Sequence, residues 1–223
     1  MNIFSVKAHC FIAVFSLVFS VRGIQGQVAP NEPGAKSETE KAVALTIKAG
    51  NELQQFRASS RTEADKYHLK RAVAYSDSAI LLNTSSNGFI FLEKAEALID
   101  MKDYDSAIQC MEQSRSRTVN EAEVVAREGF LYEKTGKSQL AQSKFKEALR
   151  LYDVQIKDKG ETKYIIVNRA ILFMFISQPA YAKKEYSRAT RRYPHDAYVN
   201  AYSKIITDNF NKEAFLKSIF FEK

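Results

Sequence analysis

The sequence contains few of the residues that interrupt regular secondary structure. Its 223 residues include 8 glycines and 4 prolines, while 45% are hydrophobic and 26% are charged. A disordered or low-complexity chain would have fewer apolar residues and more glycine or proline. We therefore expect a folded chain that is long enough to bury a core, either as one domain or as a short array of repeats.

Long apolar runs are also missing, with one exception near the N-terminus. Residues 10–21 read CFIAVFSLVFSV, with Lys7 before them and the small residues Gly23 and Gly26 after them. A membrane-spanning helix needs about 20 apolar residues, whereas a secretion signal needs a shorter run and a small-residue cleavage site. We interpret residues 1–26 as a signal peptide for export to the periplasm or out of the cell. An uncleaved N-terminal membrane anchor is the alternative.

Cysteine is scarce, and one of the two cysteines lies in the predicted signal. Its removal leaves Cys110 alone, which excludes a module held together by internal disulfides. Stability must then come from packing. We expect Cys110 to be a small, partly buried hydrophobe, and a free thiol that pairs with another molecule is the alternative.

The sequence lacks the short motifs that are typical of catalytic sites. After the predicted signal the sequence has two histidines, His68 and His195, far apart and outside any H-E-x-x-H spacing. It has no G-x-S-x-G nucleophile turn, no phosphate-binding loop and no glycine-rich dinucleotide turn. We therefore expect no enzyme activity, no cofactor and no metal site.

The remaining chain has a helical apolar period. From Glu38 onward apolar residues recur at helical spacing, without the two-residue alternation that is typical of strands. Residues 27–37 hold two prolines and a glycine and are predicted to be a flexible leader. We expect residues 38–223 to form one helical domain.

Three segments of this domain, 88–121, 122–155 and 163–196, repeat one pattern of small and large residues. The matching positions hold Ala95, Leu98, Ala107 and Met111, then Gly129, Tyr132, Ala141 and Phe145, then Ala170, Phe173, Ala182 and Tyr186. Small residues let two antiparallel helices approach closely, and the large ones fill the space between pairs. The longer interval before the third segment predicts a second helix that continues past Tyr152 and stops near Gly160.

This pattern resembles the tetratricopeptide repeat. The resemblance implies an all-α fold, a right-handed α-solenoid of antiparallel helix pairs. We expect about five pairs, of which these three match well, with a degenerate pair before them and a final pair after them.

In this family the first helix of each repeat lines a concave groove that binds proteins or peptides. The resemblance therefore implies a groove in this chain, and its Tyr164–Phe175 part is mostly apolar. That part is predicted either to bind a partner or to be covered by the chain's own C-terminal helices or leader. The matching residues are Phe89, Leu92, Glu96, Ile99 and Asp100, then Glu123, Ala126, Phe130, Glu133 and Lys134, then Tyr164, Val167, Ile171, Met174 and Phe175.

Two further features have alternative interpretations. Phe215, Leu216, Ile219 and Phe220 form a helical apolar stripe that either caps the last repeat or docks a partner or a second copy. A basic stripe (Lys184, Arg188, Arg191 and Arg192, beside Lys183) is expected to be a solvated face, and contact with an anionic surface is the alternative.

The sequence as a whole favours an exported, non-catalytic scaffold that binds a protein or peptide partner, with no nucleic acid expected. The alternative is an envelope-associated structural protein that self-associates or binds anionic polymer or lipid through the basic stripe. Host kingdom and oligomeric state are left open. So is glycosylation of the Asn83-Thr84-Ser85 triplet, which applies only in a eukaryotic host.

Overall fold

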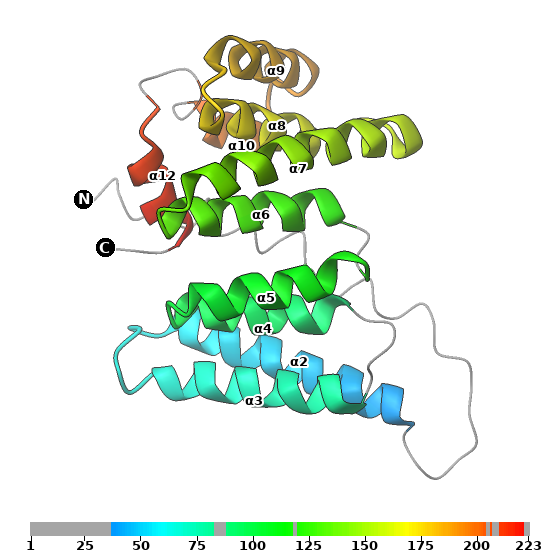
Figure 1. The fold of residues 1–223 in the computed structure, drawn as a ribbon, viewed down its shortest axis with the longest axis vertical. Coiled ribbons are helices and arrows are strands. Elements are labelled where there is room, and N and C mark those ends of the chain that lie inside the picture. Colours follow the sequence, from blue (N-terminus) through cyan, green and yellow to red (C-terminus); the bar gives the residue numbers. More distant parts are fainter. Residues whose placement is uncertain (1–36, 83–87, 118–119, 204–205, 207–209, 221–223) are drawn as a thin grey trace. The chain divides into compact units, whose positions relative to one another are not determined.

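The computed structural model describes residues 37–82, 88–117, 120–203, 206 and 210–220, and these contain helices and no strand (Figure 1). The prediction of an all-α fold is confirmed. The predicted signal 1–26 and the Asn83-Thr84-Ser85 triplet lie outside the described residues, and of the predicted leader only Ser37 is described.

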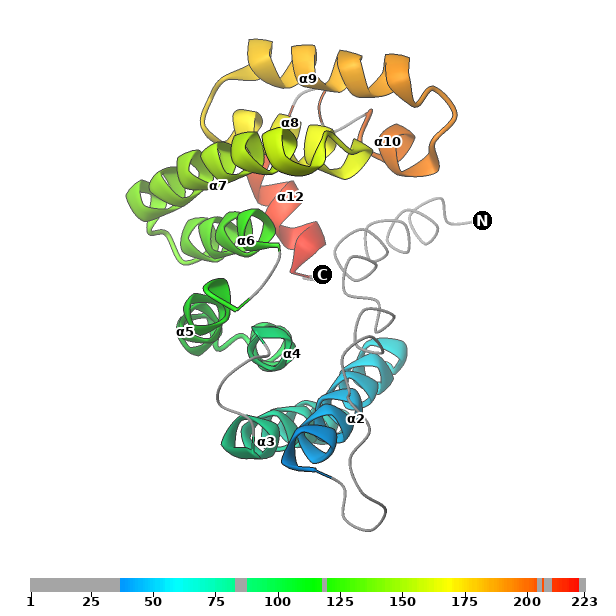
Figure 2. The same ribbon diagram turned by 90° about the vertical axis from the view of Figure 1, so that its right-hand side faces the viewer.

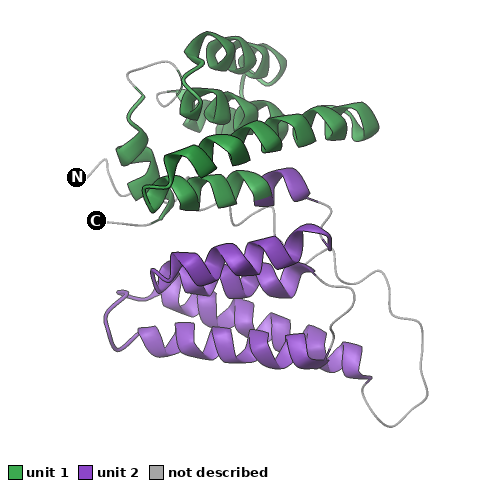
Figure 3. Ribbon diagram, in the orientation of Figure 1, with its two compact units in different colours: residues 1–20, 125–223 green, residues 21–124 purple. Residues whose placement is uncertain are grey.

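The described helices follow one another through short connections. In chain order they are α2 (Glu38–Ala58), α3 (Lys66–Leu82), α4 (Gly88–Asp100), α5 (Tyr104–Arg115), α6 (Glu121–Lys134), α7 (Ser138–Lys159), α8 (Lys163–Phe175), α9 (Pro179–Arg192), α10 (Ala197–Ala201) and α12 (Lys212–Ile219). They divide into two compact units, unit 2 up to Val124 and unit 1 from Val125 onward (Figure 3).

Unit 2 is built from the pairs α2–α3 and α4–α5. The first helix starts at a capping box, in which the Ser37 side chain accepts from the backbone N–H of Glu40 and the Glu40 carboxylate accepts from the N–H of Ser37. The core of unit 2 contains one hydrophobic cluster around Leu53, Phe56 and Leu69. A second cluster contains Ala42, Ala79 and Ile90.

Unit 1 contains α7, α8, α9, α10, α12 and most of α6. Helix α7 has 22 residues, runs to Lys159 and is followed by Gly160 at φ 81°, which confirms the long second helix expected from the sequence. Helices α6 and α7 approach so closely at Gly129 that an added Cβ would lie 2.5 Å from the ring of Phe145. Only glycine fits this crossing without displacing the ring.

One turn recurs between the helices of three successive pairs. Its central residue is left-handed, with φ values of 66° at Lys102, 76° at Gly136 and 59° at Ser177. The next N–H donates to the carbonyl five residues earlier at 2.8–2.9 Å, in the pairs Asp103 to Leu98, Lys137 to Tyr132 and Gln178 to Phe173. This is the Schellman pattern. The turns are spaced as the three matching segments are in the sequence.

Candidate interaction site

Helices α6 and α8 bring together two of the predicted groove aromatics. Phe130 on α6 and Phe175 on α8 meet edge to face, with ring centroids 5.0 Å apart. The ring of Phe145 on α7 lies 5.1 Å from each of them. All three side chains are buried. Aromatic pairs in such arrangements stabilise a core beyond the effect of the area they bury.

The C-terminal helix α12 covers this aromatic pair. The ring of Phe215 lies 5.6 Å from Phe130 and 5.4 Å from Phe175, and Phe210, just before α12, lies 5.3 Å from Phe175. Both views of the ribbon place α12 beside α6 and α8 (Figures 1 and 2). We call Phe130, Phe145, Phe175, Phe210 and Phe215 the aromatic cluster.

A lysine at the start of α12 adds a polar contact to this packing. The Nζ of Lys212 lies 3.6 Å from a carboxylate oxygen of Glu133 and 5.6 Å from the centroid of the Phe175 ring. A cation over an aromatic face is attracted by the ring's quadrupole. Glu133, a predicted groove residue, therefore contacts the chain's own C-terminal helix.

The apolar stripe of the C-terminus packs within its own chain. Phe215, Leu216 and Phe220 are buried, and Ile219 is half-buried. The C-terminal helix, one of the two coverings that the sequence allowed, lies on the α8 face, whereas the leader lies outside the described residues except for Ser37. We call the surface of α6 and α8 that receives α12 the α6–α8 face.

Other predicted groove residues of unit 1 differ in exposure. Val167 and Ile171 are buried, whereas Lys134 and Met174 are half-buried. Tyr164 is 41% exposed and lies edge-on to Tyr198, with centroids 4.9 Å apart. Met174 and Tyr164 are therefore the apolar residues of this set that solvent still reaches.

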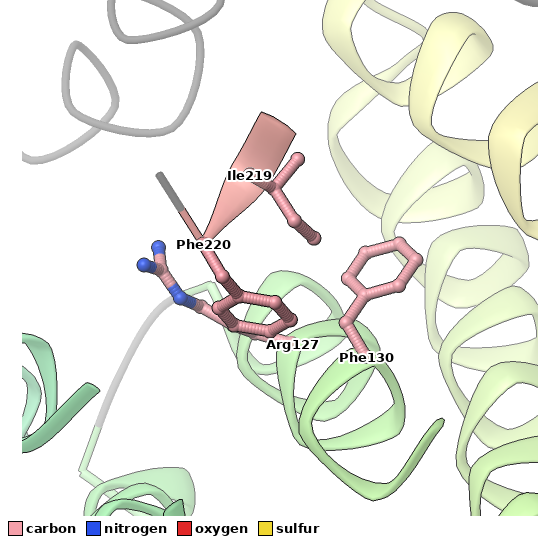
Figure 4. Close-up of a pocket in the computed structure, with 4 residues that line it drawn as sticks. All are labelled: Arg127, Phe130, Ile219 and Phe220. Carbon is pink, nitrogen blue, oxygen red and sulfur yellow. The ribbon is translucent and has the colours of Figure 1, made fainter. Parts of the chain in front are cut away.

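A shallow pocket lies where α12 ends on α6. Its lining residues are Arg127 and Phe130 of α6 and Ile219 and Phe220 at the C-terminal end of α12, and Figure 4 shows these four side chains close together. The end of α12 therefore leaves part of the surface around Phe130 unfilled.

In unit 2, two predicted groove carboxylates are bound by an arginine of α2. The guanidinium of Arg57 donates to Glu96 at 2.7 Å and to Asp100 at 2.8 Å, both on α4. Leu92 and Ile99 are buried, and Phe89 is half-buried. The two carboxylates that the predicted groove has on α4 are therefore bound within the chain by Arg57 of α2.

Burial changes the acidity of two carboxyl groups on α4. Burial, together with the nearby Glu96 carboxylate, raises the pKa of Glu93 to about 7. Burial also raises the pKa of Asp100, although the Arg57 guanidinium acts against that rise.

The predicted basic stripe lies exposed on α9, and acidic partners neutralise part of it. Arg188 contacts Glu161 at 2.6 Å and Glu185 at 2.5 Å, and Arg192 lies 3.3 Å from the same Glu161. Arg191 donates to the Ser187 carbonyl, and Lys184 is exposed.

The single cysteine and the two histidines of the described residues differ in burial and in their contacts. Cys110 is buried, and burial raises the pKa of its thiol. His68 lies 2.6 Å from Glu52, which also binds Arg71 at 2.8 Å, and His195 is exposed. Among the residues that the structure describes, no group of three or more His, Cys, Asp or Glu side chains could hold a metal ion. No helix in that part of the chain is long and apolar enough to cross a membrane.

Sequence reasoning did not identify three residues that shape these surfaces. Arg57 and Glu161 lie far from their partners along the chain, and no local pattern marks them. Lys212 had a usable signal, because it precedes the apolar stripe by one helical turn and so lies on the same side of α12 as Phe215.

Solved structures that are similar to this chain include the following two. A crystal structure of MamA is 14% identical with a TM-score of 0.42, and the match covers 69% of this chain and 84% of that one. A tetratricopeptide repeat protein from Parabacteroides merdae is 14% identical with a TM-score of 0.39, covering 97% and 93% of the two chains. No protein-family model matches the sequence, and no curated protein matches it significantly. The sequence identities and TM-scores of both matches are low, so the proposed function is argued from contacts within this chain.

Proposed function

We propose that this chain is an exported, non-catalytic scaffold that binds a protein or peptide partner on the α6–α8 face. The observation that carries the proposal is the seating of α12 there. A short amphipathic helix packs Phe215 against both Phe130 and Phe175 and places its lysine beside Glu133. This is the chemistry of helix-in-groove recognition, with apolar anchors on one helical face and a charge at the rim.

The aromatic and charged residues of the α6–α8 face are expected to contribute to binding in different ways. Buried aromatic anchors supply most of the binding energy of an interface, which assigns that role to Phe130 and Phe175. A charge at the rim mainly sets orientation and association rate, which assigns that role to Glu133. Tyr164 and Met174 are the predicted groove residues of α8 that offer a partner exposed apolar surface.

Export is the second part of the proposal, and it is supported by the N-terminal sequence alone. A short apolar run after Lys7 and small residues at 23 and 26 are typical of a cleaved signal. The intact mass of the exported protein tests this. A chain that starts at residue 24 or 27 is expected, and a full-length mass contradicts cleavage.

Photo-crosslinking tests the location of binding. A benzophenone amino acid at Tyr164 or Met174 is expected to give one discrete adduct in the exported fraction, because both are predicted groove residues of α8 that solvent reaches. The matched control places the same group at Lys146, which is exposed on α7. No adduct at positions 164 and 174, or the same adducts at all three positions, would contradict this binding face.

A further inference from the structure

Helix α12 occupies the α6–α8 face incompletely. It has eight residues, and isolated helices shorter than about 12–15 residues are marginal in water. Its helical form therefore depends on docking through Phe215, Leu216 and Phe220. The shallow pocket at Arg127 and Phe130 is left beside its last turn.

We propose that α12 is an internal occupant and that the partner of the α6–α8 face is an amphipathic helix of the same chemistry, which competes with α12. This rests on the proposed function. The expected partner helix carries a Phe–Leu pair, a second apolar residue four positions after the Phe, and a lysine three positions before it. These correspond to Phe215, Leu216, Ile219 and Lys212 of α12.

Competition follows from the geometry of the aromatic cluster. The Phe215 ring packs against both Phe130 and Phe175, with centroids 5.6 Å and 5.4 Å away, so a partner's ring cannot take the same place while Phe215 remains. A site that is open for only a fraction of the time binds its ligand more weakly by that fraction. A partner helix longer than α12 has the advantage of also covering the pocket at Arg127 and Phe130.

A labelled peptide with the sequence of residues 210–220 (FNKEAFLKSIF) is the probe, and fluorescence anisotropy with the full chain is the measurement. Lys212→Glu places a carboxylate beside Glu133 and removes the cation from the Phe175 ring, and so loosens α12 without changing any buried side chain. We expect this variant to bind the peptide at least about tenfold more tightly than the wild type, because the open fraction rises. Lys146→Glu on α7, with the same change in net charge, is expected to bind like the wild type.

A charge exchange tests the register of the helix. In Lys212→Glu/Glu133→Lys the pair is restored with reversed charges and α12 docks again, so a peptide whose lysine is replaced by glutamate is expected to bind this variant about as weakly as the wild-type peptide binds the wild type. Glu133→Lys alone breaks the same contact from α6 and is expected to bind a peptide whose lysine is replaced by glutamate. Thermal unfolding by circular dichroism checks that each variant is folded.

The outcomes separate this inference from the proposed function. Equal peptide binding by the wild type and by Lys212→Glu would show that α12 does not compete, and would overturn the inference alone. So would the absence of peptide binding while the adducts at Tyr164 and Met174 still form. Absence of both the peptide complex and the adducts would overturn the proposed function itself.

Discussion

At the scale of single residues, Glu93 shows how burial can link stability to pH. Its carboxyl group lies on α4 facing α2, 3.5 Å from where a Cβ on Gly50 would lie. Its pKa is about 7, against an ordinary value of 4.5. Between these two values the folded state holds a proton that the unfolded state has released. The contribution of Glu93 to stability is therefore present below pH 4.5 and is lost as the pH rises toward 7.

We predict that Glu93→Gln weakens this pH dependence. The free energy of unfolding of the wild type is expected to fall by about 1–3 kcal/mol more than that of the variant between pH 5 and pH 8. Urea denaturation at several pH values measures this. Some slope will remain, because burial also raises the pKa of Asp100. Glu63→Gln, at a carboxylate 86% exposed, is the control. Parallel profiles for the wild type and Glu93→Gln would contradict the prediction.

The sequence predicted which single positions would be small or large more reliably than which charges would meet. Ala95, Ala141 and Ala170 are fully buried, as their recurrence implied, because close helix crossings tolerate only small side chains. Arg57 binds Glu96 and Asp100 across 39 and 43 residues of chain. Such a pair depends on how helices pack, and no local pattern of charge encodes it.

At the scale of the helix pair, the turn that joins the two helices requires a left-handed backbone conformation, which strains any residue except glycine. Left-handed φ costs an L-residue about 1–2 kcal/mol, and glycine avoids this cost while losing part of the gain to chain entropy. Gly136 satisfies the requirement, whereas Lys102 and Ser177 adopt the same conformation with a side chain. The three turns therefore have the same geometry with different amounts of strain.

We predict opposite effects of exchanging the residues at these turns. Lys102→Gly and Ser177→Gly are each expected to stabilise the chain by roughly 0.5–1 kcal/mol, and Gly136→Ala to destabilise it by about 1 kcal/mol. An added Cβ at Gly136 would meet nothing within 4 Å, so only the backbone conformation is tested. Thermal and chemical unfolding provide the measurement. Destabilisation by both glycine substitutions would rule out strain at these turns.

The sequence predicted the helix pairs well because spacing is a local property. The interval between small residues placed the pairs, and Gly160 marked the end of the extended α7. The position of α12 could not be predicted in the same way. Its stripe of Phe215, Leu216, Ile219 and Phe220 showed that one side must be covered, but the surface that covers it is set by how α6 and α8 pack. The sequence therefore left two coverings of the groove open.

At the scale of the whole molecule, a formal charge of +7 favours contact with anionic surfaces in general. The alternative function, binding of anionic polymer or lipid, relies on the basic stripe of α9. Glu161 contacts both Arg188 and Arg192 there, and Glu185 contacts Arg188 again. Net charge alone therefore overstates the attraction that this stripe offers.

We predict that the wild type binds anionic vesicles weakly at physiological salt and that Glu161→Gln strengthens the binding. Each basic side chain near an anionic surface contributes about 1 kcal/mol, so release of Arg192, and of Arg188 as far as its contact with Glu185 allows, is expected to raise the partition coefficient roughly five- to thirtyfold. The effect should shrink as salt shortens the Debye length. Glu112→Gln, an exposed carboxylate on α5, makes the same charge change elsewhere and should have little effect. Co-sedimentation with phosphatidylserine vesicles measures this, and strong wild-type binding that Glu161→Gln leaves unchanged would favour the surface-binding function over the scaffold.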